Sequence, residues 1–300
     1  MAVAAPRPLL LAELPAWRRT LAGARGMPLF ATTIIFALFF VAIFAPLIAP
    51  HDPLVPVKGA PILAGPAWET GDWNLVLGTD FQGRDILSRV LFGTRVSLVV
   101  GLVGTIVAGG IGVFVGVIGG YLGGYTDQAL MRFVDAWLAI PGLIFAIFLS
   151  MVFGNRLGMW SIVVILGLVF WTRYARVIRG EVLSLRERDF VRLAQVAGAS
   201  KWRIMRRHIF PNILNTCMVL ASLTVGVVII LEASLSFLGL GVAPPKPSWG
   251  GMIADSRTAL IIGDWVPVAA AAVPIALTVL AFNLLGDWLR IRLDPTQRHL

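Results

Sequence analysis

The most informative part of this chain is residues 181–211, which read EVLSLRERDFVRLAQVAGASKWRIMRRHIFP. Apolar side chains recur there at the i, i+3 and i+4 spacing of an amphipathic helix, with basic side chains between them. Gly198 interrupts the pattern as a glycine at a helix C-terminus does, and Pro211 ends it. The stretch therefore predicts two short amphipathic helices joined at Gly198. The apolar positions are Phe190, Leu193, Val196 and Ala197 in the first helix and Trp202, Met205 and Ile209 in the second.

Apolar runs on both sides of this stretch are long enough to cross a membrane. The 300 residues are 58% hydrophobic and 14% charged, whereas about a quarter of a soluble domain is charged. About 20 apolar residues span a bilayer as a helix, so we predict an all-α, polytopic membrane protein with six transmembrane helices. The predicted spans are residues 29–49, 97–122, 133–153, 159–179, 213–238 and 265–286.

Small and unusual residues inside the spans predict how they pack. The second span is rich in glycine, which lets helices approach closely in lipid, so we expect it inside the bundle. Pro141 and Pro274 predict kinks in the third and sixth spans. Arg173 and Arg176 enter the end of the fourth span, where they can extend their charges to the interface.

The distribution of basic residues predicts the orientation. If the N-terminus is cytoplasmic, the inside segments hold 18 of the 25 Lys and Arg residues, so the positive-inside rule places both termini in the cytoplasm. The chain then divides into a cytoplasmic N-terminal segment (1–27), a first span with a long extracytoplasmic loop (28–95), a five-helix core (96–289) and a cytoplasmic tail (290–300).

The sequence lacks the motifs of an ATPase or a common hydrolase. A phosphate-binding loop would end in Gly-Lys-Ser or Gly-Lys-Thr, and none of Lys58, Lys201 and Lys246 follows a glycine. The single cysteine, Cys217, excludes an internal disulfide, and the three histidines are too far apart in sequence to suggest a metal site. We therefore expect no enzymatic activity, no cofactor or metal, and no nucleic-acid partner.

Two interpretations of residues 181–211 follow from physics alone. The arginines of an interfacial helix can bind anionic lipid. A helix–glycine–helix unit held at both ends by spans could instead dock an energy-supplying protein and transmit its motion.

Residues 181–211 also resemble the EAA motif of ABC importer permeases. That motif reads Glu-Ala-Ala, three residues, Gly, nine residues and Ile-x-Leu-Pro. The matching positions are Ala194, Gly198 and Pro211, and the departures are Arg192, Leu193, His208 and Phe210.

Two further segments resemble the C-type permeases of dipeptide, oligopeptide and nickel importers. They are LGTDFQGRDILSRVLFGTRVSL (Leu77–Leu98) and LEASLSFLGLG (Leu231–Gly241), the latter followed by PPKPSWGGMI (Pro244–Ile253). The resemblance covers roughly residues 28–295 and implies the MetI-like fold of type I ABC importer permeases.

The resemblance implies partners and a substrate class. We expect a second permease subunit, two ATP-binding subunits or one fused subunit, an extracytoplasmic solute-binding protein and the surrounding lipid bilayer. ATP and Mg²⁺ would bind in the partner ATPases. The expected substrate is a di- or oligopeptide, with a nickel chelate or another small solute as the alternative.

The resemblance also assigns a role to about residues 190–200, as a coupling helix seated in a groove of the ATPase. We expect Gly198 to permit a bend and close backbone approach, because glycine lacks the obstructing Cβ. The expected ATPase-contact residues are Arg192, Leu193, Ala194, Gln195, Val196, Ala197, Gly198, Ala199, Ser200 and Pro211.

Glu232 is the one acid in the middle of a predicted span. A charge in hydrocarbon costs at least a few kcal/mol, so Glu232 should face protein, water or a partner. It could line or gate the transport pathway with Ser234 and Ser236. Alternatively, it is a buried, hydrogen-bonded structural acid.

Four residues on the predicted outer side are candidates for contact with an extracytoplasmic partner: Asp80, Arg84, Asp85 and Trp249. The first three could instead form an exposed turn with Asp85 at a helix start. Trp249 could form part of a re-entrant turn, although we favour an interfacial anchor. At a cytoplasmic corner, Asp127 and Asp135 flank Arg132 and predict an ordinary surface charge pair.

Two other function classes compete with an ABC permease. An ion-coupled secondary transporter should show inverted repeats and several charged midspan sites, and we find one midspan acid and no convincing repeat. A membrane-anchored adaptor would explain the amphipathic loop but not the two flanking segments. Isolation of a stable complex with an ATPase would separate these hypotheses.

Overall fold

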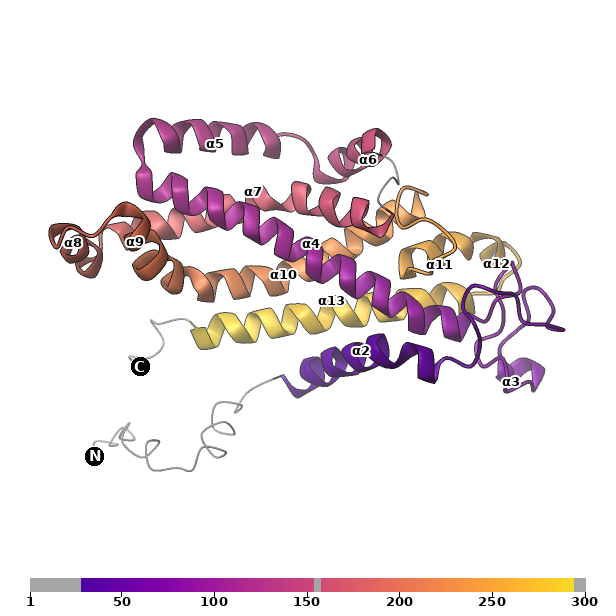
Figure 1. Cartoon of the computed structure of the whole chain (residues 1–300). Helices are drawn as coiled ribbons and strands as arrows, with labels where there is room; N and C mark the ends of the chain where they lie inside the picture. Colours follow the sequence, from indigo (N-terminus) through magenta and orange to yellow (C-terminus); the bar gives the residue numbers. More distant parts are fainter. Residues whose placement is uncertain (1–27, 154–157, 294–300) are drawn as a thin grey trace, which may run out of the picture.

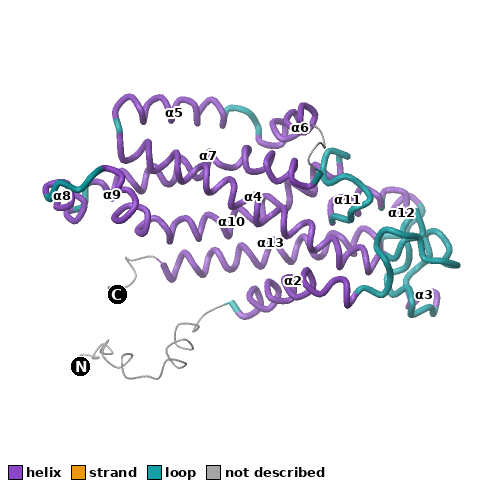
Figure 2. Tube along the Cα trace, in the orientation of Figure 1, coloured by secondary structure: helices purple, strands orange, loops and turns teal. Residues whose placement is uncertain are grey.

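The computed structural model describes residues 28–153 and 158–293. Within these ranges the chain is helical with connecting loops and no named strand (Figure 2). The long helices are α2 (Leu29–Ile48), α4 (Ile86–Leu122), α7 (Met159–Arg186), α10 (Phe210–Phe237) and α13 (Val266–Leu293). The shorter ones are α3 (Ala67–Thr70), α5 (Gly124–Leu138), α6 (Gly142–Phe153), α8 (Asp189–Val196), α9 (Lys201–Ile204), the π-helical turn Met205–Ile209, α11 (Trp249–Asp255) and α12 (Arg257–Ile261).

The helices form an elongated bundle with short helices at its two ends (Figure 1). Helices α8 and α9 lie at one end, here called the α8 end. Helices α11, α12 and α3 lie at the opposite end with the loop that precedes α4, here called the α11 end. Helix α2 lies along the side of the bundle and is mostly exposed.

The prediction of six spans is confirmed with one qualification. Five helices are long and apolar enough to cross a membrane, and a sixth span results if α5 and α6 are counted together. These two helices meet at 88° and are separated by Ala139–Pro141. The predicted kink at Pro141 is therefore confirmed, because proline disfavours helical backbone in the residue before it. Helix α13 runs through Pro274 as one helix.

Several predicted span boundaries are wrong. Helix α4 begins at Ile86, eleven positions before the predicted start at 97, because Asp85 caps it and the polar residues that follow are buried. Helix α7 continues to Arg186, since its arginines pair with acids on α5. The fifth predicted span belongs to a continuous helical stretch from Lys201 to Phe237.

The glycine-rich helix α4 packs inside the bundle, as the sequence predicted, and the structure shows that its main neighbour there is α7. An added Cβ at Gly112 would lie 2.2 Å from the Trp171 carbonyl oxygen, and one at Gly116 would lie 2.7 Å from the Ala175 carbonyl oxygen. Glycine at every fourth position thus removes the side chains that would hold the two backbones apart. This contact forms the closely packed centre between the two ends.

Candidate functional site

Helix α8 ends in a glycine cap that sets the shape of the loop. Gly198 has φ +76°, a left-handed conformation that glycine adopts without steric cost. The Gly198 N–H donates to the Gln195 carbonyl and the Ala199 N–H donates to the Ala194 carbonyl, both at 3.0 Å. This is the paired pattern of a Schellman motif. The bend expected at Gly198 is confirmed.

The next helix starts immediately after this bend. The Ser200 hydroxyl oxygen accepts a hydrogen bond from the Arg203 N–H at 3.3 Å and caps α9. Helix α9 passes through the π-helical turn into α10, so Pro211 does not end the helix as the sequence suggested. Pro211 has no N–H to donate, and the preceding turn widens so that the Phe210 N–H donates to the Met205 carbonyl.

The two faces of α8 have different surroundings. Val191 is buried with Val182, Ile204 and Ile209 in a cluster that anchors α8 to α7 and α9. The apolar positions identified from sequence lie on the other side. Leu193 is 68% exposed and Val196 is 87% exposed, and Phe190 and Ala197 are also exposed. An apolar, solvent-facing helix surface of this kind is typical of a docking site.

Electrostatics support the orientation of α8. The Arg192 guanidinium donates to the Glu187 carboxylate at 2.8 Å, and both side chains are exposed. This hydrogen bond lowers the pKa of the Glu187 carboxyl and raises the pKa of Arg192. Arg192 is thus held across the start of α8, whereas Gln195 and Ser200 remain exposed.

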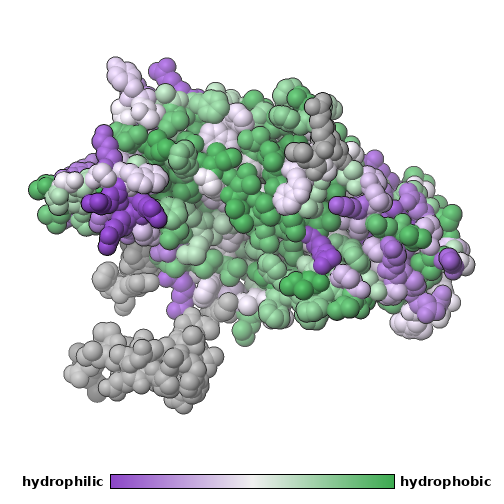
Figure 3. Space-filling view, viewed as in Figure 1, coloured by the Kyte–Doolittle hydropathy of each residue, from purple (hydrophilic) through white to green (hydrophobic). Residues whose placement is uncertain are grey.

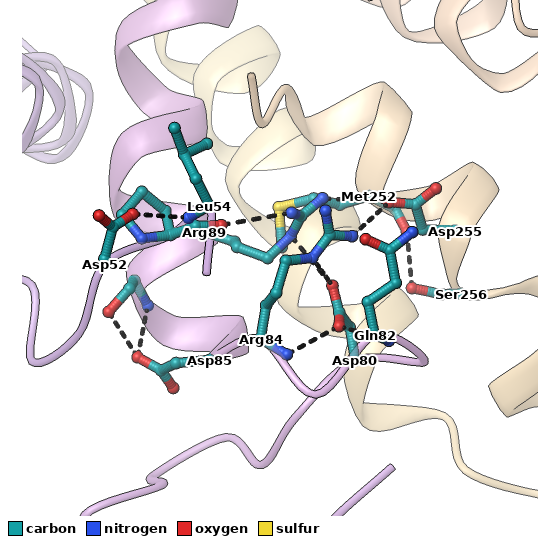
Figure 4. A network of polar contacts seen from close by, with 12 residues as sticks. Asp52, Leu54, Asp80, Gln82, Arg84, Asp85, Arg89, Met252, Asp255 and Ser256 are labelled. Atoms are coloured by element: carbon teal, nitrogen blue, oxygen red, sulfur yellow. Dashed lines mark hydrogen bonds and ion pairs between the residues drawn. The ribbon is translucent and has the colours of Figure 1, made fainter. Parts of the chain in front are cut away.

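A buried ion network ties the α11 end together (Figure 4). Arg84 Nε lies 2.7 Å from Asp80 Oδ2, and Arg84 Nη2 lies 3.3 Å from Asp255 Oδ2. Arg89 reaches the same two oxygens at 3.3 and 3.0 Å. Asp80, Arg84 and Arg89 are less than 10% exposed. Two arginines and two aspartates therefore join the loop before α4, the first turn of α4, and α11.

The outer candidates are correspondingly buried. Asp85 accepts from the Ser88 N–H at 3.0 Å as the N-cap of α4, so the predicted helix start is confirmed. The Asp85 side chain is, however, fully buried rather than exposed.

Burial raises the pKa of the Asp255 carboxyl, and the charges of Arg89 and Arg84 oppose that shift. Sequence reasoning missed Arg89 and Asp255, because Asp255 lies far from its partners along the chain and carries no local signal.

Trp249 is fully buried, so an interfacial anchor or an exposed partner contact is wrong for this conformation. Its indole Nε1–H donates to the Val90 carbonyl at 3.2 Å, and its ring lies against Gly93. The next residue, Gly250, approaches the backbone of Ala233 closely. A Cβ added to Gly250 would lie 2.4 Å from the Cα of Ala233. Trp249 and Gly250 therefore insert α11 between α4 and α10.

Glu232 lies behind this insertion and is fully buried. The Ser236 hydroxyl donates to its carboxyl oxygen at 2.7 Å, and the Ser248 hydroxyl lies 3.5 Å from that of Ser236. Ser234 instead donates to the Ile230 carbonyl and faces a groove between α10 and α13. The geometry joins Glu232 to Ser236 and separates both from Ser234, which favours the structural interpretation of Glu232.

The two acids that flank Arg132 pair with arginines of α7 and not with Arg132, which lies on their own helix α5. Asp127 accepts from Arg179 at 2.5 and 2.6 Å, and Asp135 accepts from Arg176 at 2.6 Å. Both arginines belong to α7. The predicted pairing with Arg132 is wrong because α5 folds back along α7.

The described residues contain no group of three or more His, Cys, Asp or Glu side chains arranged to hold a metal ion. The geometry instead consists of a bundle of apolar helices with an exposed apolar helix face at one end and closely packed short helices at the other.

Comparison with known proteins identifies this architecture. A family model described as the inner membrane component of binding-protein-dependent transport systems matches residues 112–299. The chain belongs to this family. It is a permease subunit of an ATP-binding-cassette importer with a MetI-like fold.

Individual relatives agree with the family assignment. The permease is 38% identical over 279 residues to the glutathione transport system permease protein GsiD of Pectobacterium atrosepticum, covering 93% of this chain and 89% of the relative. It is 39% identical, with the same coverage, to the GsiD proteins of Escherichia coli and Shigella boydii. The predicted kinship with peptide-type permeases is confirmed.

Proposed function

We propose that this permease forms half of the pathway of a peptide importer, with α8 as its coupling helix. The observation that carries the coupling role is the exposed apolar face of Leu193 and Val196 on a helix that is anchored from behind. A partner ATPase would bury this face. Packing of α8 on α7 and on α9, which continues into α10, would then transmit movement of the ATPase into the spans.

Gly198 fits the same role. Apart from Gly198 itself and its two chain neighbours, no atom of the described chain lies within 4 Å of the position where its Cβ would be. The backbone is therefore open at the bend, and an ATPase surface could approach it closely. ATP and Mg²⁺ would bind in two partner ATP-binding subunits, or one fused subunit, while this chain supplies the mechanical contact.

The substrate class rests on the relatives. Proteins named as glutathione transport permeases match nearly the whole chain, and glutathione is a small peptide. We propose import of short peptides delivered by an extracytoplasmic binding protein, through a pathway completed by a second permease subunit. Uptake of labelled glutathione and dipeptides tests this proposal, and a system that imports a nickel chelate but no peptide would contradict it.

The proposed orientation places both termini and α8 in the cytoplasm, with α11 and the loop before α4 outside. The excess of Lys and Arg in the segments near α8 supports it. Under this orientation, the network of Asp80, Arg84, Arg89 and Asp255 would brace the outer surface that faces the binding protein.

A charge on the exposed face of α8 tests the coupling role. Val196→Asp places a carboxylate where an apolar partner surface is expected, so the ATPase should no longer co-purify and substrate-stimulated ATP hydrolysis should fall at least tenfold, equivalent to about 1.4 kcal/mol. Ile261→Asp is the matched control for co-purification of the ATPase, because Ile261 is 85% exposed at the opposite end. Unchanged co-purification of the Val196→Asp variant would contradict the docking role.

A further inference from the structure

An apolar crevice of about 620 Å³ opens between α4 and α10 on the side of the bundle. Its walls include Ile106 and Phe114 from α4 and Leu214 from α10. Gly110 forms part of the wall, and a Cβ there would meet no atom within 4 Å. The described chain therefore leaves an open slot with hydrocarbon-like walls.

Three arginines stand at the end of this slot nearest α8. Arg203, Arg206 and Arg207 line an adjoining hollow of about 330 Å³ with Pro211. Arg206 lines both the hollow and the slot. Figure 3 shows strongly hydrophilic side chains at the α8–α9 end beside a broad hydrophobic face over α4 and α10.

Several other arginines near the α8 end are neutralised, whereas within the described residues these three are not. Arg176, Arg179 and Arg192 each have a carboxylate partner. In the part of the chain that the structure describes, no ion pair within 4.0 Å is found for Arg203, Arg206 or Arg207, and all three are exposed. Three unneutralised guanidinium groups at the mouth of an apolar slot fit a ligand that is anionic at one end and hydrocarbon at the other.

We propose that the slot and its three arginines bind an anionic phospholipid, with an acyl chain in the slot and the phosphate on the guanidinium groups. Guanidinium forks match phosphate oxygens. The slot extends along α4 from Thr105 to Ile118, about 20 Å at the helical rise per residue, which is enough for an acyl chain crossing about half of the ~30 Å hydrocarbon core.

The position of Trp202 agrees with a headgroup at this level. Its side chain lines the slot and is 63% exposed, as is usual for indoles at a membrane interface. The basic residues of the loop would then divide their roles. Those of α9 and the π-helical turn bind lipid, whereas α8 remains free for a protein partner.

Native mass spectrometry of the complex purified with its co-expressed subunits tests this proposal. After delipidation, the complex is offered phosphatidylglycerol or phosphatidylcholine at equal concentration. Wild type should retain phosphatidylglycerol about tenfold better, because each basic residue near the headgroup adds to the affinity for an anionic lipid. The combined variant Arg203→Gln/Arg206→Gln/Arg207→Gln should lose this preference. Arg290→Gln/Arg292→Gln, which removes two basic residues from the last turn of α13, should retain it.

A second variant tests the slot without changing any charge. Gly110→Leu fills open space, so the chain should fold with an unchanged thermal midpoint but retain several-fold less phosphatidylglycerol. Equal retention of the two lipids by wild type, or an unchanged preference in the triple variant, would overturn the proposal. Loss of the second permease subunit from Gly110→Leu, with lipid retention unchanged, would also overturn it by showing that a protein helix fills the slot.

Discussion

The side chain of Arg95 compensates for a proline on another helix. Pro46 lies inside α2 and has no N–H, so the Ala42 carbonyl one turn earlier has no partner within its own helix. Arg95 Nε, from α4, donates to that oxygen at 2.6 Å. In a membrane, an unsatisfied carbonyl is costly. Arg95 Nη2 also lies 3.4 Å from the Ile43 carbonyl, so this side chain adds a polar link to the apolar packing of α2 on the core.

A double-mutant cycle tests this compensation. Arg95→Met should lower the free energy of unfolding in detergent by about 1 kcal/mol, since it removes a charged donor. In a Pro46→Ala background the same substitution should cost measurably less, because the introduced alanine supplies the missing backbone N–H. Equal costs in the two backgrounds would show that Arg95 does not act through the Ala42 carbonyl.

Glu187 carries a prediction about pH. Because Arg192 lowers the pKa of the Glu187 carboxyl below its usual 4.5, the pairing stabilises the folded chain fully above about pH 4.5 and is lost as the pH falls through the lowered value. Carbon-13 NMR titration should give a midpoint below 4.5. Arg192→Gln should raise this midpoint, whereas Arg188→Gln should change it little. A Glu187 midpoint that does not respond to Arg192→Gln would contradict the ion pair.

At the scale of elements, the shape of the loop between α7 and α10 depends on the residue at which α8 ends. Gly198 ends α8 with a left-handed residue, and the hydrogen bonds from Gly198 and Ala199 satisfy the last carbonyls of the helix. The shape of this proposed docking unit thus depends on one backbone conformation. At the opposite end, Trp249 and Gly250 define the depth of α11 in the same way, through close packing.

Two glycines with similarly open surroundings can be compared to separate the effect of backbone conformation from the effect of space for a side chain. Gly198 and Gly180 both have open space at the Cβ position, but only Gly198 has a positive φ. Gly198→Ala should destabilise the α8 bend by about 1–2 kcal/mol, whereas Gly180→Ala, inside α7, should be neutral or stabilising by up to about 1 kcal/mol. Hydrogen exchange at the Ala199 amide measures the local effect. Equal exchange rates in the two variants would show that the left-handed conformation is not required.

At the scale of the whole molecule, the two ends are connected by the α4–α7 pair. Helix α4 reaches from the ion network at the α11 end to Leu122 near α8 (Figure 1). Glycines along it hold α7 at backbone distance. A displacement of α8 would therefore move a stiff unit rather than a single helix, which is suited to alternation between two packings in a transporter.

Site-directed labelling tests the proposed orientation of the whole chain. The single cysteine, Cys217, can be replaced by serine, after which Lys58→Cys and Ser184→Cys place exposed thiols at opposite ends. A membrane-impermeant maleimide should label Lys58→Cys in right-side-out vesicles and Ser184→Cys only in inverted ones. The reverse pattern would place α8 outside the cell and contradict the coupling role.

Local patterns in the sequence were sufficient for the membrane class, the six apolar segments, the glycine-mediated packing of α4 and the helix–glycine–helix loop. Each of these features depends on residues that are neighbours along the chain. The apolar length of a span and the backbone freedom of a glycine can both be read from such local sequence. Whether the apolar face of α8 turns toward the bundle or toward solvent was not predictable. Periodicity shows which residues share a face of a helix, but not what that face contacts.

Tertiary structure alone decided which polar residues meet. Asp255 joins Arg84 and Arg89, Asp127 joins Arg179 rather than Arg132, and Trp249 is buried against Gly93 instead of standing at an interface. These outcomes depend on how helices distant in sequence are placed. Inside a protein or a bilayer, a buried charge or N–H must find a partner wherever the fold brings one within reach.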